Sequence, residues 1–257
     1  MTHLVVLSLE AWDEVWRRNQ HLVAGLLRAD PDLRVLFVEP AADPVYAAVS
    51  ARALPRPGAG LRPGPDLVGV GPGRLWLFQP TKWLPRRIDA RVDARLARAV
   101  IRAAGVVGTR DPLLWVNDPA GAATLDATGW RALYDITDDW LAAPRTPAEH
   151  ARLVADEGAL LAQAAEVVVC SPGLAARKGA DRTVRIIPNA VDLAAYQRDS
   201  VRPADLPAGP VVLYVGTVHT DRMDLDLLAA TARALAGTAS VVCVGPAPLA
   251  PADAAAV

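Results

Sequence analysis

The sequence predicts an α/β protein in which a parallel sheet forms a first domain and a second sheet begins after a hinge. Short apolar runs alternate with segments that carry apolar residues at helical spacing, which is typical of parallel sheets with helical crossovers. Residues 183–217 hold an apolar run, a break at Pro188-Asn189, a proline-rich passage without periodicity, and another apolar run that ends at Gly216. We interpret this stretch as the hinge between two domains.

The length and composition fit one large or two modest domains. The chain has 257 residues, 52% of them hydrophobic and 21% charged, and its formal net charge of −1 gives no reason to expect a nucleic-acid partner. No run reaches the ~18 apolar residues of a membrane span, and the first residues indicate a strand rather than a targeting peptide. Cys170 and Cys243 each end an apolar run, on opposite sides of the hinge, so we expect buried, reduced thiols in a cytoplasmic protein.

The first domain is expected to open with a strand, a helix and a second strand. Residues 3–8 and 34–38 form the two apolar runs. Between them, a helix is indicated by four apolar residues at helical spacing: Leu22, Val23, Leu26 and Leu27. Residues 40–86 are broken by proline and glycine, and we expect a long loop with a hairpin between residues 67–70 and 75–78.

A basic helix is predicted for residues 85–104. Its apolar face is formed by Ile88, Val92, Leu96 and Val100. The neighbouring stripe is formed by Arg87, Arg91, Arg95, Arg98 and Arg102. Aromatic and basic side chains just before it are Trp76, Lys82, Trp83 and Arg86. This region either lies against an anionic lipid or acceptor, or is a solvated basic face whose side-chain stems cover the core.

Four more strands complete the predicted first sheet, at residues 113–116, 132–136, 167–170 and 184–187. Helices are expected at residues 120–128 and 147–164, and another helix follows the N-cap residue Ser171. Polar residues follow two of the strands, at Asn117-Asp118 and at residues 137–140. Because open α/β sheets bind ligands at the carboxyl ends of their strands, we expect a site there.

The second domain is expected to contain a strand, a helix and a strand, at residues 211–215, 223–236 and 241–244. The predicted limits are residues 1–195 for the first domain, 196–209 for the linker and 210–257 for the start of the second domain. Two strands and one helix bury too little surface for an independent sheet. We therefore expect this sheet to lean on the first domain or to continue in a longer chain.

Several catalytic motifs are absent from the sequence. No Gly-x-Gly-x-x-Gly follows the first strand, which argues against a dinucleotide-dependent dehydrogenase, and no Gly-x-x-x-x-Gly-Lys-Ser/Thr loop or Gly-x-Ser-x-Gly elbow occurs. The histidines lie far apart, without the spacing of metal ligands: His3, His21, His150 and His219. We predict no metal site and no cofactor.

Four short motifs occur in order along the chain. They are Trp12-Asp13-x-x-Trp16-Arg17-Arg18-x-Gln20-His21, Tyr134-Asp135-x-x-Asp138-Asp139-Trp140, Ile187-Pro188-Asn189-Ala190-Val191-Asp192 and Tyr214-Val215-Gly216-Thr217. Together they resemble bacterial glycosyltransferases of the GT-B fold, most of all the family 4 group that builds cell-surface polysaccharides. The resemblance implies two Rossmann-like domains, of which the first holds the acceptor and the second the nucleotide-diphosphate sugar. It also implies metal-independent, retaining transfer of a sugar to a cell-surface glycan or lipid-linked acceptor.

The resemblance implies that Gly216, Thr217 and Arg222 bind the donor. Glycine lets backbone amides approach a diphosphate, and the amino terminus of a following helix favours an anion. Arg222 would supply a cation to the leaving diphosphate. The alternative for Arg222 is a surface ion pair with Asp221 or Asp226.

On the acceptor side, three carboxylates are catalytic candidates: Asp118, Asp138 and Asp139. A carboxylate accepts hydrogen bonds from sugar hydroxyls and can take a proton. In the alternative interpretation, Asp138 only caps the helix that follows it. The other expected acceptor residues are Glu10, Trp12, Trp16, Arg17 and Trp140. The tryptophans would stack on a sugar face, or else pack in the interior.

The sequence departs from the family after Gly245-Pro246. The family's donor domain continues to a segment with two glutamates that holds the donor sugar, and residues 247–257 contain no such segment. Two alternatives therefore stay open: a noncatalytic module that binds a glycan or a partner, and a sugar-nucleotide epimerase of similar fold. For the transferase, we expect a cytoplasmic protein in peripheral contact with the inner face of the membrane.

Overall fold

The computed structural model describes residues 2–50, 56–197, 199–220 and 223–249. The chain divides into two compact units, Met1–Val191 and Asp192–Val257. Among the described residues, every helix is too short or too polar to cross a membrane.

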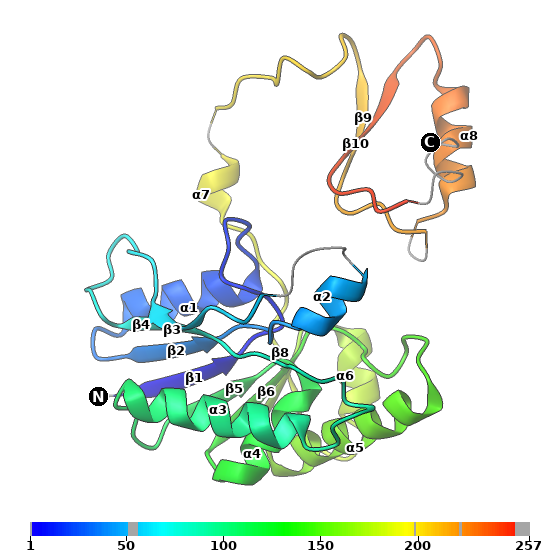
Figure 1. The fold of residues 1–257 in the computed structure, drawn as a ribbon. Helices are drawn as coiled ribbons and strands as arrows, with labels where there is room; N and C mark the ends of the chain where they lie inside the picture. Colours follow the sequence, from blue (N-terminus) through cyan, green and yellow to red (C-terminus); the bar gives the residue numbers. More distant parts are fainter. Residues whose placement is uncertain (1, 51–55, 198, 221–222, 250–257) are drawn as a thin grey trace. The chain divides into compact units, whose positions relative to one another are not determined.

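The first unit is built on an eight-stranded, mainly parallel sheet (Figure 1). In order of pairing, its strands are β3 (Gly60–Pro63), β4 (Leu75–Gln79), β2 (Arg34–Val38), β1 (His3–Leu7), β5 (Leu113–Val116), β6 (Ala132–Ile136), β7 (Glu166–Val169) and β8 (Arg185–Ile186). Of these strands, only β3 and β4 pair antiparallel. The predicted α/β class with a parallel sheet is confirmed, and the strand order reverses between β1 and β5.

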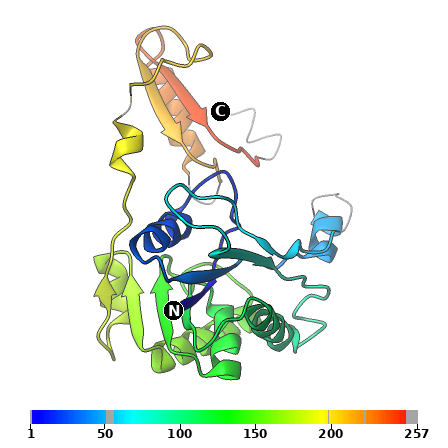
Figure 2. The same cartoon turned by 90° about the vertical axis from the view of Figure 1, so that its left-hand side faces the viewer.

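Helices cover both faces of this sheet (Figure 2). On one face, Val23 and Leu27 of α1 (Arg18–Ala29) pack with Val6 of β1. The other face is covered by α3 (Val92–Val106), α4 (Ala122–Thr128), α5 (Pro147–Gln163) and α6 (Pro172–Lys178). Val5, the neighbour of Val6, belongs to that second layer because side chains alternate along a strand. The central strands are buried on both faces, which explains why they are continuous apolar runs in the sequence.

The predicted hairpin is wrong in its first strand. β4 pairs with β3 and not with residues 67–70. In residues 67–70 the chain instead turns at Gly69, whose φ of +80° suits glycine. The segment that was expected to be a loop also contains the helix α2 (Pro44–Ser50).

The basic helix α3 begins at Val92 and not at residue 85, so its predicted apolar face is wrong at Ile88. Residues 85–91 fold into turns, where the Asp89 carboxylate accepts a hydrogen bond from the amide of Arg91 at 3.0 Å. Such a local side-chain hydrogen bond competes with the helical one. Ile88 is consequently 65% exposed, whereas Val92 is buried.

The second unit contains a two-stranded parallel sheet with one crossover helix. β9 (Val211–Val215) pairs with β10 (Ser240–Val244), and α8 (Leu225–Ala234) lies between them in the chain. A short helix, α7 (Leu193–Tyr196), precedes this sheet. The predicted strand, helix and strand are all present.

Candidate functional site

A pocket of about 570 Å³ opens at the carboxyl ends of β1, β5 and β6 in the first unit. Its walls come from the segment between β1 and α1, from the start of α1, from the residues after β5 and β6, and from residues 188–190 after β8. The charged and amide side chains in its lining include Glu10, Arg17, Arg18, Asn19, Asn117 and Asp138. This is the edge where the strand order reverses, and open α/β sheets hold their ligands at such an edge.

The segment between β1 and α1 is anchored to the sheet. The carboxylate of Glu39, which directly follows β2, accepts a hydrogen bond from the amide of Trp12 at 2.9 Å. The Trp12 ring packs edge-on against Phe37, with ring centres 4.9 Å apart, and against Trp16 at 5.8 Å. Neither tryptophan lines the pocket. Both rings are half-buried against the core and line a different pocket together with Arg62, so stacking of these tryptophans on a sugar stays a prediction.

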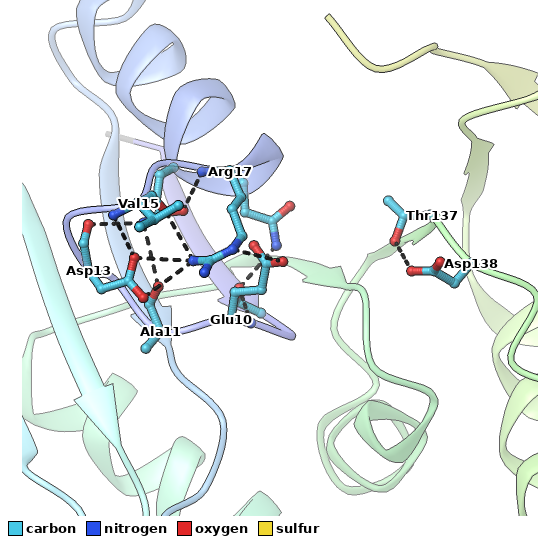
Figure 3. A network of polar contacts seen from close by, with 10 residues as sticks. Glu10, Ala11, Asp13, Val15, Arg17, Thr137 and Asp138 are labelled. Atoms are coloured by element: carbon cyan, nitrogen blue, oxygen red, sulfur yellow. Dashed lines mark hydrogen bonds and ion pairs between the residues drawn. The ribbon is translucent and has the colours of Figure 1, made fainter. Parts of the chain in front are cut away.

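Glu10 and Asp138 face the pocket from opposite walls (Figure 3). The guanidinium of Arg17 lies 3.5 Å from the Glu10 carboxylate and 3.1 Å from that of Asp13. On the other side, the hydroxyl of Thr137 donates a hydrogen bond to Asp138 at 3.3 Å. Two carboxylates and a guanidinium therefore border one space, an arrangement suited to a ligand rich in hydroxyl groups.

Burial raises the pKa of Glu10 above its ordinary value of 4.5, Arg17 opposes this rise, and the charges of Asp13 and Asp138 add to it. The folded chain therefore holds this proton more tightly than the unfolded chain does. Stability should fall as the pH rises from the ordinary pKa through the raised one. Glu10→Gln should remove this fall, and the effect is small because the side chain is half-exposed. Thermal unfolding of the native protein and of Glu10→Gln, at pH values below and above this range, measures the change of stability with pH. An equal change in the two proteins would contradict the prediction.

Arg18, Asn19 and Asn117 form part of the pocket lining, although none of them is among the predicted catalytic, donor or acceptor residues. Arg18 pairs with the buried carboxylate of Asp135 at 3.2 Å and donates hydrogen bonds to the carbonyls of residues 187 and 188. Asn19 donates to Asn117 at 2.9 Å, and Asn117 donates to the carbonyl of Asp135 at 3.0 Å. These groups satisfy one another and hold α1 against the ends of β5 and β6. The available signal was the run of polar residues at the start of an otherwise apolar helix.

Asp118 and Asp138, both predicted to be catalytic, lie in different pockets. Asp118 caps the 3-10 helix Pro119–Gly121 by accepting from one of its amides at 2.9 Å, and it lines a second pocket of about 250 Å³. Asp138 lines the larger pocket, next to Trp140. The helix that follows Asp138 is capped by Thr146 instead, so the capping alternative is wrong. Within the described residues, the buried indole Nε1 of Trp140 has no hydrogen-bond partner.

Asp139, the third carboxylate, is held in ion pairs with Lys178 at 3.0 Å and with Arg177. Burial alone would raise the pKa of Asp139, but the hydrogen bonds and charges of the two cations outweigh burial and hold it below its usual value. A carboxylate kept ionised in this way is a poor proton acceptor. Lys178 also pairs with Glu157 at 2.9 Å, so Asp139 anchors the segment that carries Asp138.

Two of the predicted donor residues, Gly216 and Thr217, follow β9 in the second unit. Gly216 and Gly245, which follows β10, have φ values of +152° and +145°. A Cβ at Gly245 would overlap the carbonyl oxygen of Gly216, so only glycine permits this close approach. The Gly216 amide donates to the carbonyl of Val244 at 2.9 Å and is not free to bind an anion in this conformation. The third predicted donor residue, Arg222, lies outside the described residues.

Neither metal-ligand groups nor disulfides are found in the described part of the chain. No cluster of three or more histidine, cysteine or carboxylate side chains in residues 2–50, 56–197, 199–220 and 223–249 could hold a metal ion. Cys170 and Cys243 are free and half-buried. The Cys170 thiol donates to the carbonyl of Thr137 at 3.2 Å, and it therefore adds a further contact to the segment after β6.

Comparisons with known proteins identify the fold. No family model matches the sequence, and no curated protein matches it. Two solved structures with 16% identity are trehalose-phosphate synthases, from Burkholderia multivorans (TM-score 0.53, covering 100% of this chain) and Burkholderia vietnamiensis (TM-score 0.54, covering 96%). A UDP-glucosyltransferase from Polygonum tinctorium has 14% identity and a TM-score of 0.51, and the match covers 95% of this chain and 72% of that one.

These similarities define the class of architecture, which is the GT-B fold of glycosyltransferases. At identities this low they show the fold alone. The matches cover 65% of the length of each of the two synthases, so this chain corresponds to about two thirds of those proteins.

Proposed function

We propose that this chain is a glycosyltransferase that moves a sugar from a nucleotide-diphosphate sugar to an acceptor bound in the pocket of the first unit. The observation that carries the proposal is that pocket, which brings Glu10, Asp138 and Arg17 together at the carboxyl edge of a GT-B sheet. Sugar hydroxyls need acceptors and donors placed around a concave site, and these side chains supply both. The proposed acceptor is a cell-surface glycan or a lipid-linked sugar.

In this proposal, Asp138 receives the proton of the attacking acceptor hydroxyl. It is the one of the three candidate aspartates that lines the larger pocket, and the hydroxyl of Thr137 is its partner there. Asp139 is unsuited because its two cationic partners lower the affinity of its carboxylate for a proton. Asp118 is unsuited because it lines the other pocket. Glu10 and Arg17 bind acceptor hydroxyls, and Trp140 offers an indole ring on which a sugar can stack.

The proposed donor residues are Gly216, Thr217 and Arg222. Departure of a nucleoside diphosphate leaves negative charge that a guanidinium can stabilise. For the amide of Gly216 to contribute, its hydrogen bond to Val244 must open when the donor binds. Neither a metal ion nor a cofactor is part of this proposal.

Asp138→Asn is expected to slow transfer by roughly two to four orders of magnitude, because the amide keeps the shape of the side chain but cannot accept a proton. The rate of nucleoside diphosphate release by the full chain would be measured with a panel of UDP- and GDP-sugars and oligosaccharide acceptors. Asp32→Asn, which changes an exposed aspartate in the turn between α1 and β2 that does not line the pocket, is the matched control. Equal rates for Asp138→Asn and the control would contradict the assignment of the base.

Two outcomes of the same assay would contradict glycosyl transfer itself. Binding of a nucleotide sugar or a glycan without any release of nucleoside diphosphate would favour a noncatalytic module. Conversion of the donor to a different sugar nucleotide in the absence of acceptor would favour an epimerase. Product analysis by mass spectrometry and NMR separates these cases.

A further inference from the structure

Large aromatic and aliphatic side chains of the first unit project into solvent from α2 and from residues 81–91. Tyr46 on α2 is 67% exposed, and Trp83 is 58% exposed. Leu84 and Ile88 are also exposed. The two segments are joined because the amide of Lys82 donates to the carbonyl of residue 42 at 2.7 Å. With the arginines described next, these residues form what we call the aromatic-basic surface: Tyr46, Trp83, Leu84, Ile88, Arg87 and Arg91.

The segment that carries most of this surface, together with the first part of α3, has an excess of positive charge. Residues 82–102 contain seven lysines and arginines and two aspartates, whereas the whole chain has a net charge of −1. Three of the cations are neutralised by ion pairs: Lys82 with Asp43, Arg86 with Asp93 and Arg95 with Asp89. Arg87 and Arg91 are exposed and form no ion pair with any described residue. Their guanidinium groups are therefore free to meet an anionic partner.

One of the aromatic side chains, Tyr46, also borders a groove next to these cations. The groove has a volume of about 630 Å³ and is lined by α2, by residues 82–87 and by the first turn of α5. Tyr46, Arg87 and Lys82 contribute to its lining. A ring with a polar tip beside an unpaired arginine is the combination that proteins place at the boundary between lipid headgroups and acyl chains.

We propose that the aromatic-basic surface binds membranes that contain anionic lipids. Trp83 and Tyr46 lie at the level of the headgroups, Leu84 and Ile88 enter the acyl boundary, and Arg87 and Arg91 contact lipid phosphates. The exposed guanidinium groups of Arg87 and Arg91 favour an anionic bilayer, because lipid phosphates supply the negative charge that these arginines do not find among the described residues. The proposal goes beyond sugar transfer and does not depend on it. Trp76, included in the patch expected from the sequence, instead packs against the core.

The test is sedimentation of the full chain with vesicles of phosphatidylcholine alone and of phosphatidylcholine mixed with phosphatidylglycerol. We expect binding to the mixed vesicles. Arg87→Gln combined with Arg91→Gln should lower the partition coefficient about 25-fold, because each basic residue near an anionic surface contributes roughly 5-fold. The charge-matched control, Arg110→Gln with Arg131→Gln, removes two exposed arginines elsewhere and should lower it less than 2-fold.

A second variant tests the apolar part of the surface. Tyr46→Ala with Trp83→Ala should weaken binding in high salt as well as in low salt, since burial of aromatic area is not screened. All altered side chains are exposed, so unchanged thermal unfolding is expected and serves as the folding control. The proposal is overturned if the full chain does not bind the mixed vesicles, if the control pair weakens binding as much as Arg87 and Arg91, or if the aromatic variant binds normally. A change of oligomeric state in these variants with unchanged vesicle binding would overturn it in favour of a protein interface.

Discussion

Replacing Lys178 with methionine is expected to lower the free energy of unfolding of the first unit by about 3–5 kcal/mol. The Lys178 ammonium lies 2.9 Å from the carboxylate of Glu157 and 3.0 Å from that of Asp139. Glu157 is only 1% exposed. Methionine fills the space of the lysine stem but leaves Glu157 in the interior without its cation, and an uncompensated buried charge is strongly destabilising.

Urea unfolding followed by tryptophan fluorescence measures this loss. All seven tryptophans lie in the first unit, so the signal reports on that unit alone. The double variant Glu157→Gln with Lys178→Met should recover most of the stability, because it removes the buried charge. Arg177→Met, which breaks the exposed pair with Asp139, should cost less than about 1 kcal/mol. A loss for Lys178→Met no larger than for Arg177→Met would show that the buried pair has little influence.

Arg18→Met is expected to have an effect of similar size, about 3–5 kcal/mol, and to loosen the pocket as well. Asp135 is 1% exposed and would lose the cation that lies 3.2 Å away. Asp135→Asn should cost less, roughly 1–3 kcal/mol, because it leaves behind a guanidinium that still donates to the carbonyls of residues 187 and 188. The same urea titrations compare the two variants.

Hydrogen exchange tests the effect of Arg18 on the pocket. The amide of Ile187, which donates to the carbonyl of Val169 at 2.9 Å, should exchange faster in Arg18→Met, because three of the Arg18 hydrogen bonds hold residues 187–189 in place. Arg28→Met is the matched control, since Arg28 lies on the same helix and donates to the carbonyl of Val68 at an exposed site. Similar stability losses for Arg18→Met and Arg28→Met, or unchanged exchange of the Ile187 amide, would contradict this role.

Most of the sheet could be predicted from the sequence, because strands buried on both faces are continuous apolar runs. β2, β5 and β6 lie at the predicted residues. The proline- and glycine-rich segment was the exception. There, β3 (Gly60–Pro63) has no buried residues and hence no apolar pattern, whereas the apolar residues 67–70 form a turn. Pairing with β4, not local composition, selects the strand.

The candidate site was predictable in part. Arg17, Asp138 and Trp140 were selected from their motifs and Glu10 from its position just after the first strand, and all four line the pocket at the carboxyl ends of β1, β5 and β6. The sequence could not predict which of the three aspartates is held in ion pairs and which faces the pocket, since Asp138 and Asp139 are adjacent in the chain. The ion pair with Lys178, 39 positions away along the chain, distinguishes them.

The sequence by itself determined the α/β class and the order of most strands and helices. It also determined the position of polar residues at the carboxyl ends of β1, β5 and β6. Local periodicity and burial on both faces explain this, because they leave a direct pattern in the residues. Only the tertiary structure decided which of those polar groups share a pocket and which are neutralised. It placed Arg18 on Asp135 and Lys178 between Glu157 and Asp139. These pairs join residues far apart in the chain, and whether a charge is paired or free depends on distances that no local pattern contains.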